Sequence, residues 1–210
     1  VQILKITSGE LTNIPFLERV AALHLFTIIS TGMATMEEVH DAAAPFGKAD
    51  VPFALLHCLS AYPAPMNQIN LRAMETLRRE FSVPVGYSDH TEGIEVSIMA
   101  ASLGAEIIEK HFTLDRTMEG PDHAASLEPD ELAEMIRRIR DKDFLKNVQV
   151  PPAVLGDGVK RCQPNEENVR RVARRSVTIT RDAAVGTVLS ADMLSIKRPG
   201  TGIAPKDRTS

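Results

Sequence analysis

Short apolar runs alternate with amphipathic helical patterns from residue 1 to about residue 145, and this repeat constrains the fold more than any other feature. The runs are Ile3–Ile6, Thr27–Ser30, Phe53–His57, Val83–Tyr87 and Glu106–Lys110. Alternation of this kind is typical of strand–helix units whose strands form a parallel sheet. The runs are short and mostly apolar, as expected for strands that are buried on both faces.

The segments between the runs carry helix start and stop signals. Thr35 and Glu38 have the spacing of a capping box, which predicts a helix that ends at Gly47, a residue suited to the left-handed stop position. The other predicted helices begin at Asn70, Thr91 and Pro129, and the second of these ends at Gly104.

Two α/β architectures fit five such units, an open doubly wound sheet and a barrel. No glycine-rich phosphate loop joins the first strand to its helix, which disfavours the open sheet. An eight-stranded (β/α)8 TIM barrel typically takes about 250 residues. We therefore expect the last five βα units of such a barrel, in an N-terminally truncated chain that begins at Val1 without Met.

The character of the sequence changes after the repeats. We assign residues 1–148 to the barrel, residues 149–168, which are rich in Pro and Gly, to a linker, and residues 169–210 to the start of a small β-rich domain. Its predicted strands are Ser176–Thr180, Val185–Leu189 and Met193–Lys197, with a turn near Gly186. These are too few to close a β domain, so we expect it to be incomplete.

Composition excludes several classes of protein. The net charge of -4 is spread along the chain, so neither nucleic acid nor a membrane surface is an expected partner. No apolar run approaches the roughly 20 residues of a membrane-spanning helix, and the N-terminus does not have the pattern of a signal peptide. The cysteines Cys58 and Cys162 are too few for a disulfide scaffold, which favours the cytoplasm.

Polar side chains follow every predicted strand, at the barrel end where active sites are built. They are Lys5, Thr7, Ser8 and Glu10; Ser30 and Thr31; His57, Ser60 and Tyr62; Ser88, Asp89 and His90; and Lys110 and His111, with Asp122 further along the last loop. Their repetition after five strands predicts an active site.

The types of these side chains suggest their roles. His90 and His111 follow neighbouring strands and can converge on one divalent metal ion, a Lewis acid able to polarise a carbonyl group. A single histidine in such a place is more often only a hydrogen-bonding group, and we assign His24 and His40 to the surface and His57 and His123 to supporting roles.

The remaining polar groups suggest a phosphate and a proton-transfer step. Lys5 with Ser8, Ser30, Ser60 and Ser88 offers an ammonium and hydroxyl groups to a phosphate, although each serine could instead cap a helix. The carboxylates of Glu10 and Asp122 are candidates for proton transfer or for binding sugar hydroxyls, or are solvated loop residues.

Six stretches resemble the sialic acid synthase family. They are KITSGE (Lys5–Glu10), ISTGM (Ile29–Met33), LLHCLSAYPAP (Leu55–Pro65), GYSDHT (Gly86–Thr91), EKHFTLDR (Glu109–Arg116) and GPDHAASLEPDEL (Gly120–Leu132). In addition, KRPGTGI (Lys197–Ile203) is similar to the start of that family's C-terminal antifreeze-like (SAF) domain. The resemblance covers nearly the whole chain in the right order.

The resemblance implies an N-acetylneuraminate synthase, which condenses phosphoenolpyruvate with open-chain N-acetylmannosamine to a nine-carbon 2-keto acid and releases phosphate. His90 and His111 would bind the metal, usually Mn2+, with Mg2+ and Co2+ as other candidates. Three further sets of residues match family positions: Lys5, Ser8, Ser30 and Ser88 bind phosphoenolpyruvate; Glu10 lies near the reacting carbons; and Tyr62 and Asp122 contact the sugar.

Two positions carry further implications. Ser60 stands where the family often has Asn. Arg198 matches an arginine that reaches into the active site of a partner subunit, which implies a domain-swapped homodimer. Family contacts from the upstream strands are absent, so we expect the chain alone to be inactive.

Alternatives remain open. A legionaminic acid synthase, using 2,4-diacetamido-2,4,6-trideoxymannose, shares these motifs, and a pseudaminic acid synthase ranks below it. A barrel aldolase would need a Schiff-base lysine, for which Lys5 and Lys110 are the candidates. A non-catalytic carbohydrate-binding barrel would be expected to have lost a site residue, and none is evidently lost.

Overall fold

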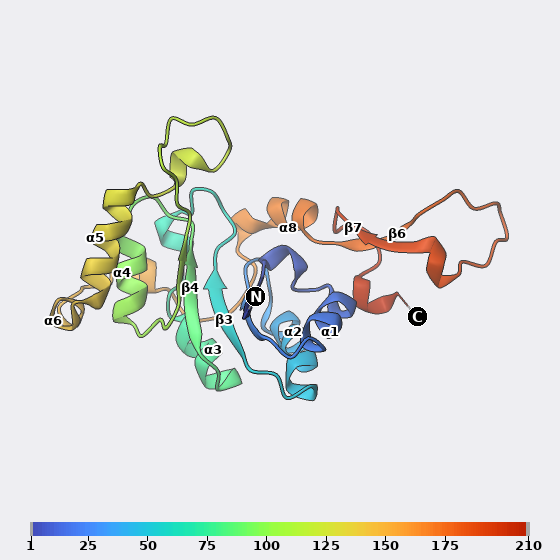
Figure 1. Cartoon of the computed structure of the whole chain (residues 1–210), viewed down its shortest axis with the longest axis horizontal. Coiled ribbons are helices and arrows are strands. Elements are labelled where there is room, and N and C mark those ends of the chain that lie inside the picture. Colours follow the sequence, from blue (N-terminus) through green and yellow to red (C-terminus); the bar gives the residue numbers. More distant parts are fainter. Residues whose placement is uncertain (1, 209–210) are drawn as a thin grey trace.

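The computed structural model describes residues 2–208 and contains a curled, parallel five-stranded sheet with the order β1-β2-β3-β4-β5 (Figure 1). The strands are β1 (Ile3–Ile6), β2 (Phe26–Ser30), β3 (Phe53–Cys58), β4 (Val85–Asp89) and β5 (Ile108–Lys110). Each strand pairs in parallel with the next one along the chain. The sheet is thus half of a TIM-like barrel, and all five predicted strands are confirmed with small shifts at their ends.

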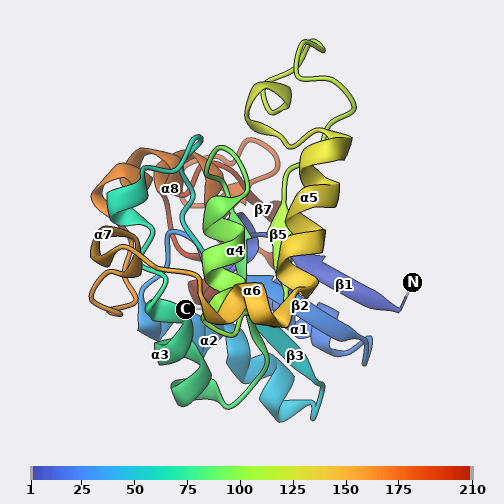
Figure 2. The same ribbon diagram turned by 90° about the vertical axis from the view of Figure 1, so that its left-hand side faces the viewer.

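Helices follow the strands and cover the outer face of the sheet (Figure 2). They are α1 (Ile14–Ala21), α2 (Met36–Lys48), α3 (Ala73–Phe81), α4 (Glu95–Ser102) and α5 (Pro129–Arg140). The main core lies between these layers, where Phe46, Leu55 and Leu77 have no exposed surface. Burying each such side chain stabilises the fold by about 1.5–3 kcal/mol.

The helix starts and stops were only partly predicted. The capping box of α2 is confirmed, with Thr35 N donating to Glu38 Oε2 at 3.0 Å and Glu38 N donating to Thr35 Oγ1 at 3.3 Å. Gly104 also has the expected left-handed backbone, with φ of 84°. Gly47, in contrast, lies inside α2, and the left-handed residue is Asp50 with φ of 52°.

Asn70 does not cap α3, which begins at Ala73. Its side chain instead accepts a hydrogen bond from Gly158 N at 2.8 Å and donates one to Val159 O at 3.0 Å. The side chain of a polar residue before a helix can bind the backbone of that helix or the backbone of a distant segment. Here it binds the distant segment at Gly158 and Val159.

The segment predicted as a linker lies on the barrel and is anchored to α3. Backbone N–H groups of Leu71 and Arg72 donate to Val154 O and Leu155 O at 3.0 and 2.9 Å. In addition, Thr76 Oγ1 donates to Gly158 O at 2.8 Å. The segment shows no periodicity in the sequence because it is held by backbone contacts, which need no regular spacing of side chains.

The elements that follow α5 are α6 (Lys142–Lys146), α7 (Pro152–Leu155), the 3-10 turn η4 (Pro164–Glu166), α8 (Glu167–Ala173), β6 (Ser176–Ile179), η5 (Ala191–Met193), β7 (Leu194–Lys197) and η6 (Pro205–Asp207). The 3-10 turns η1 (Ser8–Glu10), η2 (Met66–Gln68) and η3 (His123–Ala125) lie earlier in the chain. Among residues 2–208, no helix combines the length and the apolarity needed to cross a bilayer.

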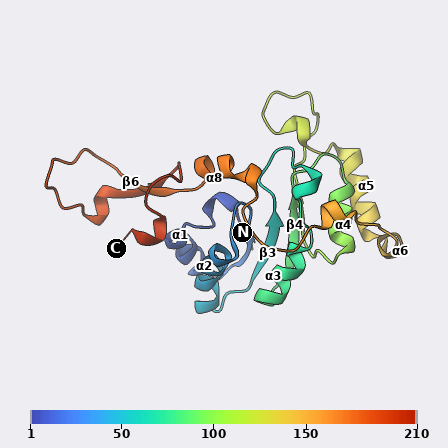
Figure 3. The ribbon, with the colours of Figure 1, turned by 180° about the vertical axis from the view of Figure 1, so that it is seen from behind.

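The β-rich end of the chain is an antiparallel pair, β6 and β7, that extends away from the barrel (Figure 3). The predicted strand over Val185–Leu189 is wrong, because that run forms an exposed loop around a turn at Gly186. Its apolar side chains find no neighbouring strand among the described residues, so nothing fixes an extended backbone there. The last two residues of the predicted domain lie outside the described residues.

Candidate functional site

A pocket of about 260 Å³ lies at the carboxyl ends of the five strands. The predicted site residues that line it are Lys5, Ser8, Ser30, Ser60, Tyr62, Ser88, His90, His111 and Arg198. Val169 and Ala173 of α8 close one side. We call this the hydroxyl pocket, and it brings together the strand-end groups as the parallel topology requires.

Glycine at position 32 makes room for the hydroxyl groups. Gly32 N donates to Ser8 Oγ at 2.9 Å. A Cβ atom on Gly32 would lie 2.2 Å from Ser60 Oγ and 2.8 Å from Ser8 Oγ, far inside contact distance. The serines after β1 and β3 can therefore approach each other only because the residue after β2 has no side chain.

Ser30 is a residue of the hydroxyl pocket whose buried hydroxyl has no partner within the described chain. Its exposed fraction is 2%, and its Oγ makes no hydrogen bond within the described chain. A buried hydroxyl normally has a partner, so one that faces a pocket without one indicates a ligand that supplies the missing contact.

Glu109 on β5 is a pocket residue that the sequence reasoning missed. It lies 3.2 Å from Lys5 Nζ and accepts a hydrogen bond from Ser88 Oγ at 2.7 Å. Side chains alternate along a strand, so Glu109 faces the same side as His111. The two-residue spacing between Glu109 and His111 in the sequence is the signal that would have identified Glu109 as a pocket residue.

His90 and His111 lie next to each other, with ring centroids 5.4 Å apart and an angle of 74° between the rings. Tyr62 packs on the same pair, 4.3 Å from His90 between centroids. The Nδ1 atom of His90 lies 2.8 Å from Leu59 O, which assigns the proton to Nδ1 and leaves Nε2 free to bind a ligand.

Cys58 is a second contact of the His90 ring, at 3.8 Å from Nδ1. Burial raises the pKa of the Cys58 thiol, but its contacts with His90 and Ser8 outweigh burial and hold that pKa below its usual value. Burial lowers the pKa of His90, but the contacts with Cys58 and Leu59 O outweigh it and raise that pKa. These neighbours hold the ring in one orientation.

His90 and His111 offer two imidazole groups to a metal ion. The part of the chain that the structure describes has no group of three or more His, Cys, Asp or Glu side chains placed for a metal. Water and substrate oxygens would have to complete the coordination of an ion bound by the two imidazoles.

A second pocket of about 190 Å³ shares Tyr62, His90 and His111 with the first. Its other lining residues are Pro63, Asp89, Glu92, Pro121, Asp122, Ala124 and Ala125. We call it the acidic pocket. The histidine pair therefore lies between a pocket lined by hydroxyls and cations and a pocket lined by carboxylates and apolar groups.

Glu10 lines neither pocket. Its carboxylate pairs with Arg175 and accepts a hydrogen bond from Asn13 Nδ2 at 2.9 Å. Proton transfer in the hydroxyl pocket would require Glu10 to leave Arg175.

Lys110 lies outside both pockets, on the opposite side of β5 from His111. Its Nζ is 3.0 Å from Asp89 Oδ2, with side-chain exposures of 3% and 0%, and it also donates to Thr91 O. Asp89 accepts further hydrogen bonds from Thr91 N at 2.8 Å and Ser97 Oγ at 2.6 Å. A lysine held in this way is a poor Schiff-base candidate, and it fixes the backbone on both sides of His90.

Three other histidines lie outside both pockets, and His40 is on the surface as predicted. His57 Nε2 lies 2.8 Å from Ile69 O, and burial lowers the pKa of His57 to about 3, so its ring is neutral. His123 contacts Thr113 Oγ1 at 2.7 Å, and His40 pairs with Glu80 on the surface.

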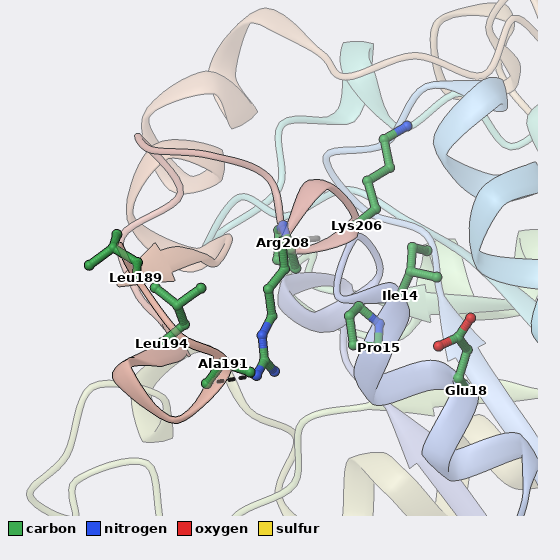
Figure 4. Close-up of a pocket in the computed structure, with 9 residues that line it drawn as sticks. Ile14, Pro15, Glu18, Leu189, Ala191, Leu194, Lys206 and Arg208 are labelled. Carbon is green, nitrogen blue, oxygen red and sulfur yellow. Dashed lines mark hydrogen bonds between the residues drawn. The ribbon is translucent and has the colours of Figure 1, made fainter. Parts of the chain in front are cut away.

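A wider cavity of about 620 Å³ lies away from these groups, between α1 and the C-terminal segment (Figure 4). Ile14, Pro15 and Glu18 of α1 line one side of it, and Leu189, Ala191 and Leu194 line the other. None of the strand-end groups lines it, so the candidate site consists of the two pockets at the strand ends.

A curled parallel sheet with a lysine, serines and a histidine pair at its strand ends defines an α/β half-barrel protein with a candidate site at the strand ends. The chain belongs to the NeuB family, whose model matches residues 1–148. This confirms the resemblance found in the sequence.

Relatives and solved structures agree with this assignment. The N,N'-diacetyllegionaminic acid synthase of Legionella pneumophila is 45% identical over 99% of this chain and 57% of its own length, and the human N-acetylneuraminate-9-phosphate synthase is 37% identical over 94% and 53%. The structure of the spore coat polysaccharide biosynthesis protein SpsE of Bacillus subtilis matches with a TM-score of 0.88, at 34% identity, over 97% of this chain and 60% of that one. The chain thus spans little more than half the length of its relatives.

Proposed function

We propose that the full-length protein condenses phosphoenolpyruvate with an open-chain N-acetylated amino sugar, forming a nine-carbon 2-keto sugar acid and phosphate. Family membership makes a sugar acid synthase the class of enzyme expected. The names of the Legionella and human relatives, both acid synthases of this kind, support the reaction.

The main support for phosphoenolpyruvate binding is that the hydroxyl of Ser30 is buried and has no hydrogen-bond partner within the described chain. Together with Lys5, Ser8 and Ser88 it lines a pocket suited to the phosphate and carboxylate of phosphoenolpyruvate. Glu109 holds Lys5 and Ser88 in place through its two carboxylate oxygens.

We assign the divalent metal to His90 and His111, with Mn2+ as the ion proposed and Mg2+ and Co2+ as alternatives. When bound, the ion supplies a Lewis acid for the carbonyl group of the sugar. The Leu59 carbonyl orients the His90 ring for this role. Tyr62 and Asp122, which line the acidic pocket, are proposed to bind the sugar. Glu10 stays a prediction as the proton-transfer group.

The acceptor sugar has two candidates. N-acetylmannosamine is the sugar that the family resemblance implies. The walls of the acidic pocket favour 2,4-diacetamido-2,4,6-trideoxymannose, because Pro63, Pro121, Ala124 and Ala125 suit a methyl group in place of a hydroxymethyl. Legionaminic acid synthases from two organisms are 45% and 44% identical to this chain, which also supports the deoxygenated sugar.

The C-terminal part and the assembly are also proposals. We propose that residues 169–210 begin a SAF domain, supported by KRPGTGI and the β6–β7 pair. Arg198 lines the pocket of its own chain, and exchange of this segment between two copies would give the proposed domain-swapped homodimer. Cys58 and Cys162 are both free, which supports the cytoplasm as the compartment.

Phosphate release by the full-length protein tests the reaction. We expect release only when phosphoenolpyruvate, an amino sugar and a divalent metal are all present, and mass spectrometry of the keto acid will identify the sugar from a panel. The His90→Ala, His111→Ala double variant should lose turnover at least a thousandfold, because the carbonyl loses its Lewis acid. Near-normal turnover in that variant would reject the metal assignment, and release without sugar would reject the condensation.

A further inference from the structure

Glu166 is a buried acid directly behind the hydroxyl pocket. It lies at the end of η4, in the segment that follows the barrel, and its exposed fraction is 1%. Its Oε1 accepts hydrogen bonds from Met33 N at 2.8 Å and from Ser60 N at 2.7 Å. Its Oε2 accepts one from Gln163 N at 2.9 Å. One carboxylate therefore ties the turn after β2 to the loop after β3.

Two buried cations from the same segment hold the turn after β2 from its carbonyl side. Arg174 donates from one nitrogen to Gly32 O at 3.3 Å and to Met33 O at 3.2 Å. Lys160 Nζ donates to Ala34 O at 2.9 Å. Charge-assisted contacts of this kind are stronger than neutral ones, so the backbone of the turn is closely specified.

The turn needs this support because Met33 has a left-handed backbone, with φ of 59°. For a residue other than glycine, the left-handed conformation costs about 1–2 kcal/mol of conformational free energy. Met33 is also buried, at 2% exposure, and lines the hydroxyl pocket. Contacts from outside the barrel therefore stabilise a strained turn at the edge of the pocket.

The contacts continue from the turn to the serine hydroxyls. Gly32 N, at the start of the turn, donates to Ser8 Oγ at 2.9 Å. The N–H of Ser60 donates to Glu166, and Ser60 Oγ lies beside Ser8 Oγ in the space that a Cβ atom on Gly32 would take. A movement of the turn would displace the hydroxyls from the loops after β1 and β3 together.

Nearby cations offset the negative charge of Glu166. Burial lowers the pKa of Lys160 to about 8, and it also lowers the pKa of Arg174, while attraction to Glu166 opposes both shifts. The bound amides and these cations allow a carboxylate to lie behind an anion-binding pocket without strong repulsion of the anion.

We propose that Glu166 is a positioning residue that holds the turn at Gly32–Ala34 and the loop at Ser60 so that Ser8 and Ser60 face the phosphate of phosphoenolpyruvate. This proposal rests on the proposed function of the hydroxyl pocket. The segment after the barrel is then part of the phosphoenolpyruvate site, although Glu166 itself need not touch the ligand.

Steady-state kinetics of Glu166→Gln and Glu166→Ala in the full-length protein test the proposal. Gln keeps one oxygen for the two amides but loses the charge, so we expect the KM for phosphoenolpyruvate to rise about tenfold, and further in the Ala variant. The KM for the sugar should stay within twofold of wild type. Calorimetric titration with inorganic phosphate should show a matching rise in Kd.

Amide hydrogen exchange gives a readout that does not need turnover. Peptides containing Met33 and Ser60 should exchange faster in both variants, while those from α5 should not change. Glu167→Gln is the matched control, since Glu167 is the next residue and is exposed, and it should change none of these quantities.

A folded Glu166→Gln variant with both KM values within twofold of wild type, or with both raised equally, would overturn the proposal. Failure of both variants to fold would also reject it, because Glu166 would then maintain the fold as a whole. If the wild type releases no phosphate from phosphoenolpyruvate, the proposed reaction fails, while phosphate binding and amide exchange still decide the role of Glu166.

Discussion

At Gly32, in the loop after β2, side chains from β3 and from the loops after β1 and β3 approach the backbone. Its missing side chain leaves the space that Ser8 Oγ and Ser60 Oγ occupy, and Cys58 Sγ would lie 3.2 Å from a Cβ atom there. The backbone of Gly32 is not left-handed, so the space, and not the conformation, requires glycine. The hydroxyl pocket therefore depends on an absent side chain.

Gly32→Ala is expected to weaken phosphate binding more than it weakens the fold. The serine side chains can rotate away from the new methyl group, which removes their hydroxyls from the pocket but leaves the core intact. We expect the Kd for inorganic phosphate to rise at least tenfold in calorimetric titration of the full-length protein.

Gly47→Ala is the control, because a Cβ atom there meets nothing within 4 Å. That helical substitution should stabilise α2 by about 0.5–1 kcal/mol and leave binding unchanged. Unchanged phosphate affinity in Gly32→Ala would contradict this account of the pocket.

At the scale of the elements, β4 and β5 are joined by a buried ion pair as well as by their backbone ladder. Lys110 lies outside both pockets, and its partner Asp89 is buried and also lines the acidic pocket. Through Thr91 the pair also fixes the start of the loop after β4. The position of His90, between Asp89 and Thr91, thus depends on this buried ion pair.

Lys110→Met should destabilise the protein strongly, since it leaves the Asp89 carboxylate buried without its counter-charge. Removing one partner of a buried pair typically costs about 3–5 kcal/mol. Urea unfolding at pH 7 would measure the loss. Lys146→Met, which breaks the exposed pair with Asp143, is the control and should change the free energy of unfolding by less than about 1 kcal/mol. An equal effect of the two substitutions would show that the buried pair has no special role.

At the scale of the whole molecule, the sheet is half of a barrel with an edge at β1, where Ile3 is 55% exposed. The segment after α5 returns across the strand ends and contributes Glu166, Lys160 and Arg174 to the loops of the barrel. The candidate site is thus built from both ends of the described chain.

We expect residues 1–210 expressed alone to release no phosphate from phosphoenolpyruvate, whereas the full-length protein does. The physical reason is that the opposite half of a barrel would supply the other walls of both pockets. A coupled phosphate assay on the two proteins under identical conditions makes the comparison. Equal turnover would show that the half-barrel contains a complete site.

Much of this arrangement could be read from the sequence because it depends on local patterns. The five strands follow from apolar runs of strand length, and the start of α2 follows from the spacing of Thr35 and Glu38. The parallel topology then places Ser30, His90 and His111 at one edge of the sheet, since groups after successive parallel strands meet there.

The tertiary structure alone decided which of these groups face one another and what holds them. Glu10 lies beside Arg175 and not in the pocket, Asn70 binds the distant segment at Gly158, and Glu166 reaches amides more than a hundred residues away in the chain. No local pattern records such contacts, because a carboxylate or an amide has several partners of similar energy and the packing of the whole chain selects among them. The sequence by itself determined a parallel half-barrel with a strand-end site, and the folded chain determined how that site is held together.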